Sequence, residues 1–234
     1  MMQTASYQQR RNQIEAYFDR TAAKAWERLT SDAPVSGIRA TVRAGRERMR
    51  ETMLSWLPHD LSGCRLLDAG CGTGALAIEA ARRGAHVVGV DLSPTLIGIA
   101  KERAPRDLRP GFVEFLSGDM LDASLGRFDF VVAMDSLIHY RAGDVVRVLG
   151  TLAGRTNSTM LFTFAPRTPA LAAMHMAGRL FPKSDRAPAI EPVSQAALTK
   201  LILAEPALKG WQPGRTQRIA SGFYTSQAME IVRA

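Results

Sequence analysis

The feature that most constrains the fold of this chain is the segment 66–74, LLDAGCGTG, where a short apolar run leads into three closely spaced glycines. We predict a β-strand that ends near Asp68 and turns through Gly70, Gly72 and Gly74 into a helix. Glycine tolerates a positive φ and lets a ligand lie against the backbone, while a helix N-terminus favours an anionic group. Dinucleotide-binding proteins use similar loops, so the motif predicts a nucleotide-like ligand without identifying it.

Strand and helix patterns alternate along the rest of the chain. This order predicts a mostly parallel sheet with helices on both faces, closed by an antiparallel hairpin through Ser221–Gly222: an α/β, Rossmann-like fold with seven strands. The predicted strands are 65–69, 86–90, 112–116, 128–134, 160–165, 215–220 and 225–232. The predicted helices are 75–83, 93–103, 142–153 and 195–204.

Helical periodicity without a strand pattern marks the first part of the chain. We therefore predict an N-terminal helical cap over 1–58 and a Rossmann-like domain over 59–234. Within that domain, the Met- and Ala-rich segment 169–181 is predicted as a helix and is followed by a proline-rich stretch. We interpret about 167–195 as a lid-like insertion; core packing is the alternative for its helix.

Charge and cysteine content narrow the function classes. The net charge is +8, and residues 1–50 hold nine Arg and one Lys against five acids. This excess is typical of a solvated helix or of attraction to an anionic partner. No apolar core of a signal peptide and no stretch of about 20 apolar residues is evident, so we expect a cytoplasmic protein. Two cysteines and four scattered histidines predict neither a disulfide framework nor a protein metal site.

Three features favour S-adenosylmethionine over NAD as the ligand. The glycine spacing is GxGxG, an acid precedes it at Asp68, and a further acid, Asp119, follows the third strand. We predict that Asp68 lies near the ammonium group, that Asp91 accepts from both ribose hydroxyls and that Asp119 accepts from the adenine amine. Each acid alone could instead cap a turn or helix. The predicted cofactor-binding residues are Asp68, Gly70, Cys71, Gly72, Gly74, Asp91, Leu92, Asp119, Met120 and Met134.

The segment after the fourth strand bears on the acceptor. It lacks the D/N-P-P-Y/F motif of amino-methylating DNA enzymes, and no alternation of aromatic and basic residues predicts nucleic-acid binding. His139 lies just beyond the expected cofactor crevice, where it could act as a base or donate a hydrogen bond to a substrate; a structural role is the alternative.

The strand-end acids and the glycine loop together resemble the class I methyltransferase superfamily over about residues 60–165 and the final hairpin. Three further segments, YFDRTAAKAW at 17–26, IRATVRAGRERM at 38–49 and MDSLIHY at 134–140, resemble the magnesium-protoporphyrin IX O-methyltransferases of (bacterio)chlorophyll biosynthesis. Relatives commonly carry a tyrosine at the position of Thr30, so an essential phenol role is not carried over and His139 alone is transferred as the catalytic candidate.

The resemblance implies methyl transfer from S-adenosylmethionine to a propionate carboxylate of magnesium protoporphyrin IX, with S-adenosylhomocysteine as the second product. The metal ion would belong to the substrate. We predict substrate contacts from Thr30, Arg39, Arg43 and Tyr140. Arg39, Arg43 or Arg46 could bind a carboxylate of the substrate or of the cofactor in a bidentate way, and surface solvation is the alternative for at least two of them. The family also implies contact with the porphyrin-binding subunit of magnesium chelatase and weak peripheral association with the photosynthetic membrane. A methyltransferase for a quinone precursor or another carboxylic acid, and a non-catalytic tetrapyrrole carrier, remain alternatives.

Overall fold

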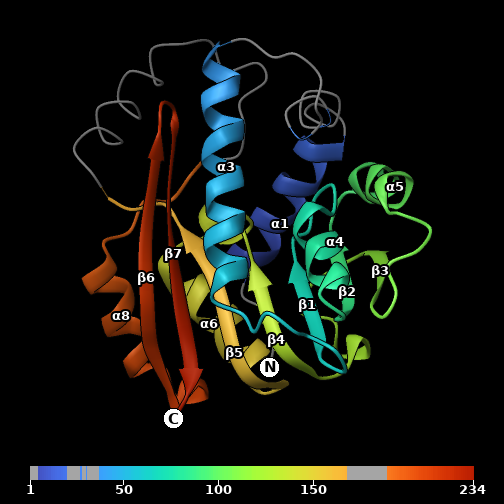
Figure 1. Ribbon diagram of the computed structural model, residues 1–234. Coiled ribbons are helices and arrows are strands. Elements are labelled where there is room, and N and C mark those ends of the chain that lie inside the picture. Colours follow the sequence, from blue (N-terminus) through green and yellow to red (C-terminus); the bar gives the residue numbers. More distant parts are fainter. Residues whose placement is uncertain (1–4, 20–26, 28–29, 31–36, 168–188) are drawn as a thin grey trace.

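The computed structural model describes residues 5–19, 27, 30, 37–167 and 189–234, so the helix predicted at 169–181 lies outside the described residues (Figure 1). A seven-stranded sheet runs through the molecule in the order β3-β2-β1-β4-β5-β7-β6. The strands are β1 (Arg65–Ala69), β2 (His86–Asp91), β3 (Phe112–Ser117), β4 (Phe128–Ala133), β5 (Thr156–Phe164), β6 (Trp211–Ser221) and β7 (Tyr224–Arg233).

Helices precede the sheet and connect its strands. They are α1 (Ala5–Tyr17), α3 (Gly37–Ser55), α4 (Ala75–Arg82), α5 (Pro94–Arg103), α6 (Ala142–Ala153) and α8 (Gln195–Ala204), with short 3₁₀ helices η2 (Ala123–Leu125), η3 (Leu137–His139) and η4 (Pro206–Leu208). The predicted bounds of α6 and α8 are confirmed. Helix α5 begins after Ser93, whose hydroxyl accepts the Leu96 N–H at 3.2 Å, as expected for an N-cap.

The predicted parallel sheet with a closing hairpin is confirmed. Strands β1 to β5 are parallel, whereas β7 is antiparallel to β5 and to β6. Strand β5 begins at Thr156, four residues before its predicted start. The prediction missed these residues because they are polar and do not resemble a buried strand. The Thr156 hydroxyl donates to the Leu152 carbonyl at 2.8 Å. The hairpin is also longer than predicted. Ser221 pairs with Tyr224, so its turn is one residue further along the chain.

Both faces of the sheet are buried by helices, and alternate residues of each strand serve opposite cores. In β1, Leu66 packs with Met49 and Met53 of α3, whereas Leu67 belongs to the core on the other face with Leu149 of α6. Helices α3, α4 and α5 cover the first face, and α1, α6 and α8 contribute to the second (Figure 1). The N-terminal segment therefore contributes a helix to each side of the sheet.

The strand order places a topological switch point between β1 and β4, because the chain runs outward from β1 to β3 and then returns to β4 on the other side. Ligands of such sheets bind at the carboxyl ends of the strands at this point. Near the same edge, Pro166 and Val193 form a parallel bridge, so the described ends of the predicted insertion lie together. Over the described residues we find no helix that combines the length and apolar character needed to cross a membrane.

Candidate active site

The glycine loop turns tightly between β1 and α4. Gly70, Gly72 and Gly74 all have positive φ, at 80°, 55° and 80°. A Cβ atom on Gly70 would lie 2.3 Å from the Cβ of Ser136, and one on Gly74 would lie 2.5 Å from the Phe115 ring. Gly70 thus permits close contact with the segment after β4. Gly74 instead permits packing of the α4 N-terminus against β3.

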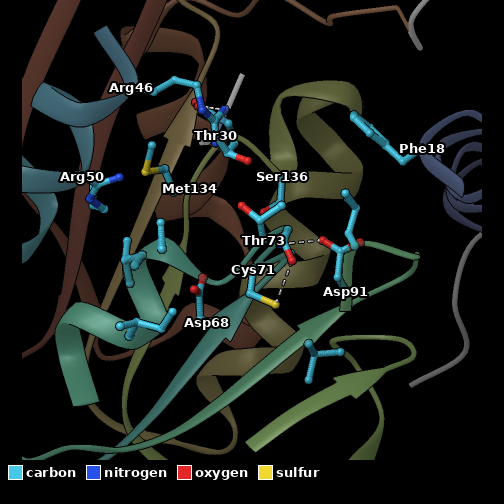
Figure 2. Close-up of a pocket in the computed structure, with 18 of the residues that line it drawn as sticks. Phe18, Thr30, Arg46, Arg50, Asp68, Cys71, Thr73, Asp91, Met134 and Ser136 are labelled. Carbon is cyan, nitrogen blue, oxygen red and sulfur yellow. Dashed lines mark hydrogen bonds and ion pairs between the residues drawn. The ribbon is translucent and has the colours of Figure 1, made fainter. Parts of the chain in front are cut away.

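A cavity of about 330 Å³ opens at the carboxyl ends of the strands, within the range expected for a small-molecule site. Most of the residues predicted for cofactor or substrate line it: Thr30, Arg43, Asp68, Gly70, Cys71, Gly72, Asp91, Leu92, Met120, Met134, His139 and Tyr140. Gly74, Arg39 and Asp119 do not. Figure 2 shows Asp68 and Asp91 on the wall that β1 and β2 contribute, with Arg46 and Arg50 on the side of α3.

Asp68 presents a buried carboxylate to this cavity. The side chain is 2% exposed, and its Oδ2 atom has no hydrogen-bond partner among the described residues. Desolvation raises the pKa of Asp68 to about 7, while a hydrogen bond from the Ala77 backbone N–H opposes the rise. A buried acceptor of this kind is costly unless a donor or a cation satisfies it. The position suits a ligand that carries an ammonium group.

Asp91, at the end of β2, is held by backbone donors. Its Oδ2 accepts the Gly72 N–H at 2.9 Å, and its Oδ1 accepts the Ser93 N–H at 3.0 Å. Burial raises the pKa of Asp91, and these N–H groups oppose the rise. A carboxylate accepts about four hydrogen bonds, so capacity remains for hydroxyl groups of a ligand. Leu92 and Met120 line the cavity beside it, as expected for the walls of a ring-binding site.

Asp119 is the third of the predicted acids. Its neighbours Gly118 and Met120 line the cavity, but Asp119 does not. Its Oδ1 accepts the Tyr7 hydroxyl at 3.0 Å, and its Oδ2 pairs with Arg11 at 3.0 Å. Helix α1 packs beside the end of β3, and two of its side chains bind the Asp119 carboxylate. The local sequence does not reveal this tertiary contact. An adenine contact through Asp119 therefore stays a prediction.

The arginines predicted on α3 differ in position because the helix extends past the cavity. Arg43 lines it, whereas Arg39, one turn earlier, is exposed and outside the wall. A substrate contact through Arg39 therefore stays a prediction. Thr30 does line the cavity, and Arg103 at the end of α5 donates to its hydroxyl at 2.8 Å and to its carbonyl at 3.1 Å.

His139 and Tyr140 lie at the end of the segment that follows β4. His139 is 7% exposed, lines the cavity, and meets the Phe18 ring edge-on with centroids 6.2 Å apart. Tyr140 stacks on Tyr7 at 5.0 Å, and burial raises the pKa of its phenol well above the ordinary value. Tyr140 is therefore a neutral hydroxyl at physiological pH.

A buried polar cluster around Asp135 was not predicted. Asp135 has a φ of 54°, and its carboxylate pairs with Arg46 at 2.7 Å. It also accepts from the hydroxyl groups of Tyr224 at 3.1 Å, Ser226 at 3.1 Å and Thr163 at 3.2 Å. The cluster joins β4, β5 and β7 to α3. The one available signal was an acid directly after a buried strand, and its partners are too distant in sequence to be inferred.

Comparison with known proteins identifies the family. A family model described as the C-terminus of magnesium-protoporphyrin IX methyltransferase matches residues 133–233, and a methyltransferase-domain model matches 66–157. The chain is 53% identical over 227 residues to the magnesium-protoporphyrin O-methyltransferase of Rhodobacter capsulatus, covering 97% of this chain and 98% of that protein. The chain belongs to the magnesium-protoporphyrin O-methyltransferase family.

Two further relatives agree with this assignment. The magnesium-protoporphyrin O-methyltransferase of Synechocystis sp. PCC 6803 is 30% identical over 94% of this chain and 95% of that protein. The crystal structure of magnesium protoporphyrin IX methyltransferase from Synechocystis PCC 6803 with bound SAH matches with a TM-score of 0.83 at 29% identity, covering 95% of this chain and 99% of that one. The likeness therefore extends over nearly the whole chain.

The cavity of this family member fits S-adenosylmethionine. The unpartnered Oδ2 of Asp68 suits its ammonium group, and Asp91 has acceptor capacity for the ribose hydroxyls. Gly70 keeps the loop backbone close to Ser136, and both residues line the cavity. Within the described ranges, no group of three or more His, Cys, Asp or Glu side chains is arranged to bind a metal ion.

Proposed function

We propose that this protein transfers the methyl group of S-adenosylmethionine to a propionate carboxylate of magnesium protoporphyrin IX, giving the monomethyl ester. One observation carries the proposal beyond family membership. A single cavity is lined both by the acids that follow β1 and β2 and by His139 and Tyr140 after β4. Groups that suit the donor and groups that suit an acceptor therefore line the same cavity.

The acceptor needs little chemical activation. A propionic acid has an ordinary pKa of about 4, so the substrate carboxylate is already ionised at neutral pH. When bound, S-adenosylmethionine supplies an electrophilic methyl group. The protein's contribution is to position the carboxylate, to exclude water and to hold the donor in line. His139 orients the carboxylate by donating a hydrogen bond, and it abstracts no proton.

The cationic side chains of α3 support an acidic substrate. Arg43 lines the cavity, as does Arg46, which is already paired with Asp135. We assign Arg43, which lines the cavity and belongs to the predicted set, to a substrate carboxylate. A guanidinium group presents two parallel N–H donors to such a group.

Because the substrate is lipophilic, the proposal also includes where the protein is located and which partners it contacts. We place the protein in the cytoplasm, with weak peripheral contact with the photosynthetic membrane and with the porphyrin-binding subunit of magnesium chelatase. The nine arginines and one lysine within residues 1–50 support an electrostatic contribution to such contacts. Sedimentation with anionic vesicles at low and high salt measures the membrane contact, which salt should weaken.

The proposed activity is tested with radiolabelled S-adenosylmethionine and magnesium protoporphyrin IX. We expect a labelled monomethyl ester and a perturbed Soret band on substrate binding. His139→Ala should lower kcat by about tenfold to a hundredfold, as expected when an orienting hydrogen bond is lost. His139→Gln should retain more activity because it keeps a donor. His59→Ala, in an exposed loop, is the control.

The outcomes separate the alternatives. Binding of S-adenosylhomocysteine with no response to the porphyrin would favour a quinone precursor or another carboxylic acid as acceptor. Porphyrin binding without cofactor binding would favour a carrier. Either result would contradict the proposed reaction, as would the absence of a methyl ester product.

A further inference from the structure

Two large apolar side chains are exposed where α3 meets the hairpin of β6 and β7. Ile38, at the start of α3, is 58% exposed, and Phe223, in the turn of the hairpin, is 57% exposed. They flank a single contact between the two elements. The Thr41 hydroxyl donates to the Ile38 carbonyl at 2.7 Å, and a Cβ atom on Gly222 would lie 2.3 Å from the same hydroxyl. We call Ile38 and Phe223 the apolar tip.

The apolar tip protrudes at the end of the molecule where the cavity opens. Strand β7 begins at Tyr224, but its antiparallel pairing with β5 starts only at Gln227, opposite Phe164. The turn therefore extends about 10 Å past the carboxyl end of β5, at a rise of about 3.4 Å per residue. Figure 1 shows the end of the hairpin beside the first turns of α3. Neither Ile38 nor Phe223 lines the cavity itself.

The surface around the apolar tip is basic. Residues 37–46 of α3 hold three arginines and no acid, and residues 211–229 of the hairpin hold two arginines and no acid. Arg39, Arg48 and Arg218 are exposed, and none of them forms an ion pair with a residue that the structure describes. Arg48 donates to the Ala220 carbonyl at 3.0 Å, which holds its charge beside the hairpin. Cations that no acid neutralises attract an anionic surface.

The combination of projecting apolar side chains and surrounding arginines favours a bilayer over a protein as the partner. Near an anionic leaflet, apolar side chains enter the boundary between headgroups and acyl chains, while basic side chains remain at the phosphate groups. A stable protein interface needs a broad, well-packed apolar centre. Two side chains at the ends of a helix and a hairpin supply little of such an area, whereas a fluid bilayer adapts to a projecting tip.

We propose that the apolar tip inserts into the headgroup region of an anionic bilayer, with Arg39, Arg48 and Arg218 at the lipid phosphates. The inference rests on the proposed function, because it assigns a surface to the peripheral membrane contact included there. Bound in this way, the protein turns the end that carries the cavity toward the bilayer. A lipophilic substrate dissolved in the bilayer then reaches the cavity without crossing bulk water.

The test measures binding of the whole chain to phosphatidylcholine vesicles with and without phosphatidylglycerol. Ile38→Ser and Phe223→Ser should each weaken binding to the mixed vesicles by about five- to tenfold, because insertion removes more than half of each side chain from water. Arg39→Gln combined with Arg218→Gln should weaken it by about twenty- to thirtyfold at low salt and by much less at high salt. Vesicles of phosphatidylcholine alone should bind weakly and should not respond to the arginine changes.

Matched controls make the same chemical changes away from the apolar tip. Leu203 on α8 is 65% exposed and Phe112 on β3 is 52% exposed, so Leu203→Ser and Phe112→Ser remove comparable apolar surface. Arg106→Gln with Arg233→Gln removes the same charge from exposed positions elsewhere. Each control should change vesicle binding by about twofold or less. Circular dichroism and the melting temperature verify that every variant is folded.

A second measurement reports insertion directly. Phe223→Trp adds a fluorophore to the apolar tip, and lipids brominated near the headgroup should quench the added fluorescence. Phe112→Trp adds the same fluorophore at the amino end of β3 and should not be quenched beyond the wild-type protein.

Three outcomes would overturn the inference alone. The wild type could fail to bind the mixed vesicles, the variants of the apolar tip could bind them as well as the wild type does, or Phe223→Trp could remain unquenched. Methyl ester formation from detergent-solubilised porphyrin separates these outcomes from the proposed function. Without vesicles, Ile38→Ser and Phe223→Ser should keep the wild-type kcat and KM, because both residues lie outside the cavity. A raised KM would assign the apolar tip to the acceptor instead, and absence of ester from the wild type would contradict the proposed function.

Discussion

Replacing Gly70 by alanine tests how tightly the cofactor loop is tied to the segment that carries His139. Gly70 has a φ of 80°, and a Cβ atom there would lie 2.3 Å from the Ser136 Cβ and 3.0 Å from its Oγ. Ser136 is itself fixed, because its hydroxyl donates to the Ala69 carbonyl at 2.7 Å. The substitution must therefore displace Ser136 and the turn that leads to His139.

The expected cost has three contributions. The left-handed backbone conformation destabilises the folded alanine variant by about 1–2 kcal/mol. Alanine also lowers the conformational entropy of the unfolded chain, which offsets about 0.4–1 kcal/mol of this cost. Overpacking against Ser136 adds about 1–3 kcal/mol. The free energy of unfolding should fall by about 2–4 kcal/mol, which for a chain of this length lowers the melting temperature by about 5–15 °C. Gly63→Ala is the control, since Gly63 has a φ of 76° and a Cβ atom there would have no other atom within 4 Å.

The assay is thermal unfolding by circular dichroism, combined with calorimetric titration of S-adenosylhomocysteine. Gly63→Ala should lose about 1 kcal/mol or less and keep its affinity, because it has only the backbone cost. Adding Ser136→Gly to Gly70→Ala removes the clashing Cβ and should recover part of the lost stability. Equal melting temperatures for the two alanine variants, together with undiminished affinity of Gly70→Ala, would refute the reasoning.

Two further predictions concern buried acids. Because the pKa of Asp68 is raised from 3.8 to about 7, the ligand-free protein should lose stability as pH rises from about 4 to about 7. An ammonium group favours the ionised form of Asp68, so cofactor binding at pH 6 should release a proton. Calorimetry in two buffers of different ionisation enthalpy measures this release. Equal release by Asp68→Asn would contradict the prediction. Asp135→Ala leaves the guanidinium of Arg46 without its carboxylate and should cost about 3–5 kcal/mol in urea unfolding. Asp135→Asn should cost less because asparagine tolerates positive φ, and equal losses for the two variants would refute the role of the backbone conformation.

The sheet and the positions of the acids at its strand ends were predictable because their determinants are local. Each acid directly follows an apolar strand, and parallel strands bring their carboxyl ends to one edge whatever the details of packing. Asp68, Asp91 and Leu92 accordingly line the cavity. Asp119 also follows its strand, but helix α1 supplies Tyr7 and Arg11 to its carboxylate from more than a hundred positions away.

Helix faces were less predictable than strand ends. Periodicity places Arg39, Arg43, Arg46 and Arg50 on one face of α3, but it does not show where along the sheet the helix lies. That register decides which arginine is exposed to solvent, which pairs with an acid and which line the cavity. The same uncertainty explains why Arg39 was included in the predicted site while Arg50 was not.

The register of α3 is set by two adjacent residues. A Cβ atom on Gly45 would lie 2.5 Å from the Tyr224 ring, so the helix packs directly on the closing hairpin at this point. The next residue, Arg46, pairs with Asp135, and the Tyr224 hydroxyl donates to the same carboxylate at 3.1 Å. Helix, hairpin and the end of β4 thus meet at one buried charge. Because Arg50 follows Arg46 by one turn, the contact that holds α3 on the sheet also determines how far along the cavity wall Arg50 lies. The cofactor site is therefore completed by tertiary contacts of α3, although half of it is built from local strand ends.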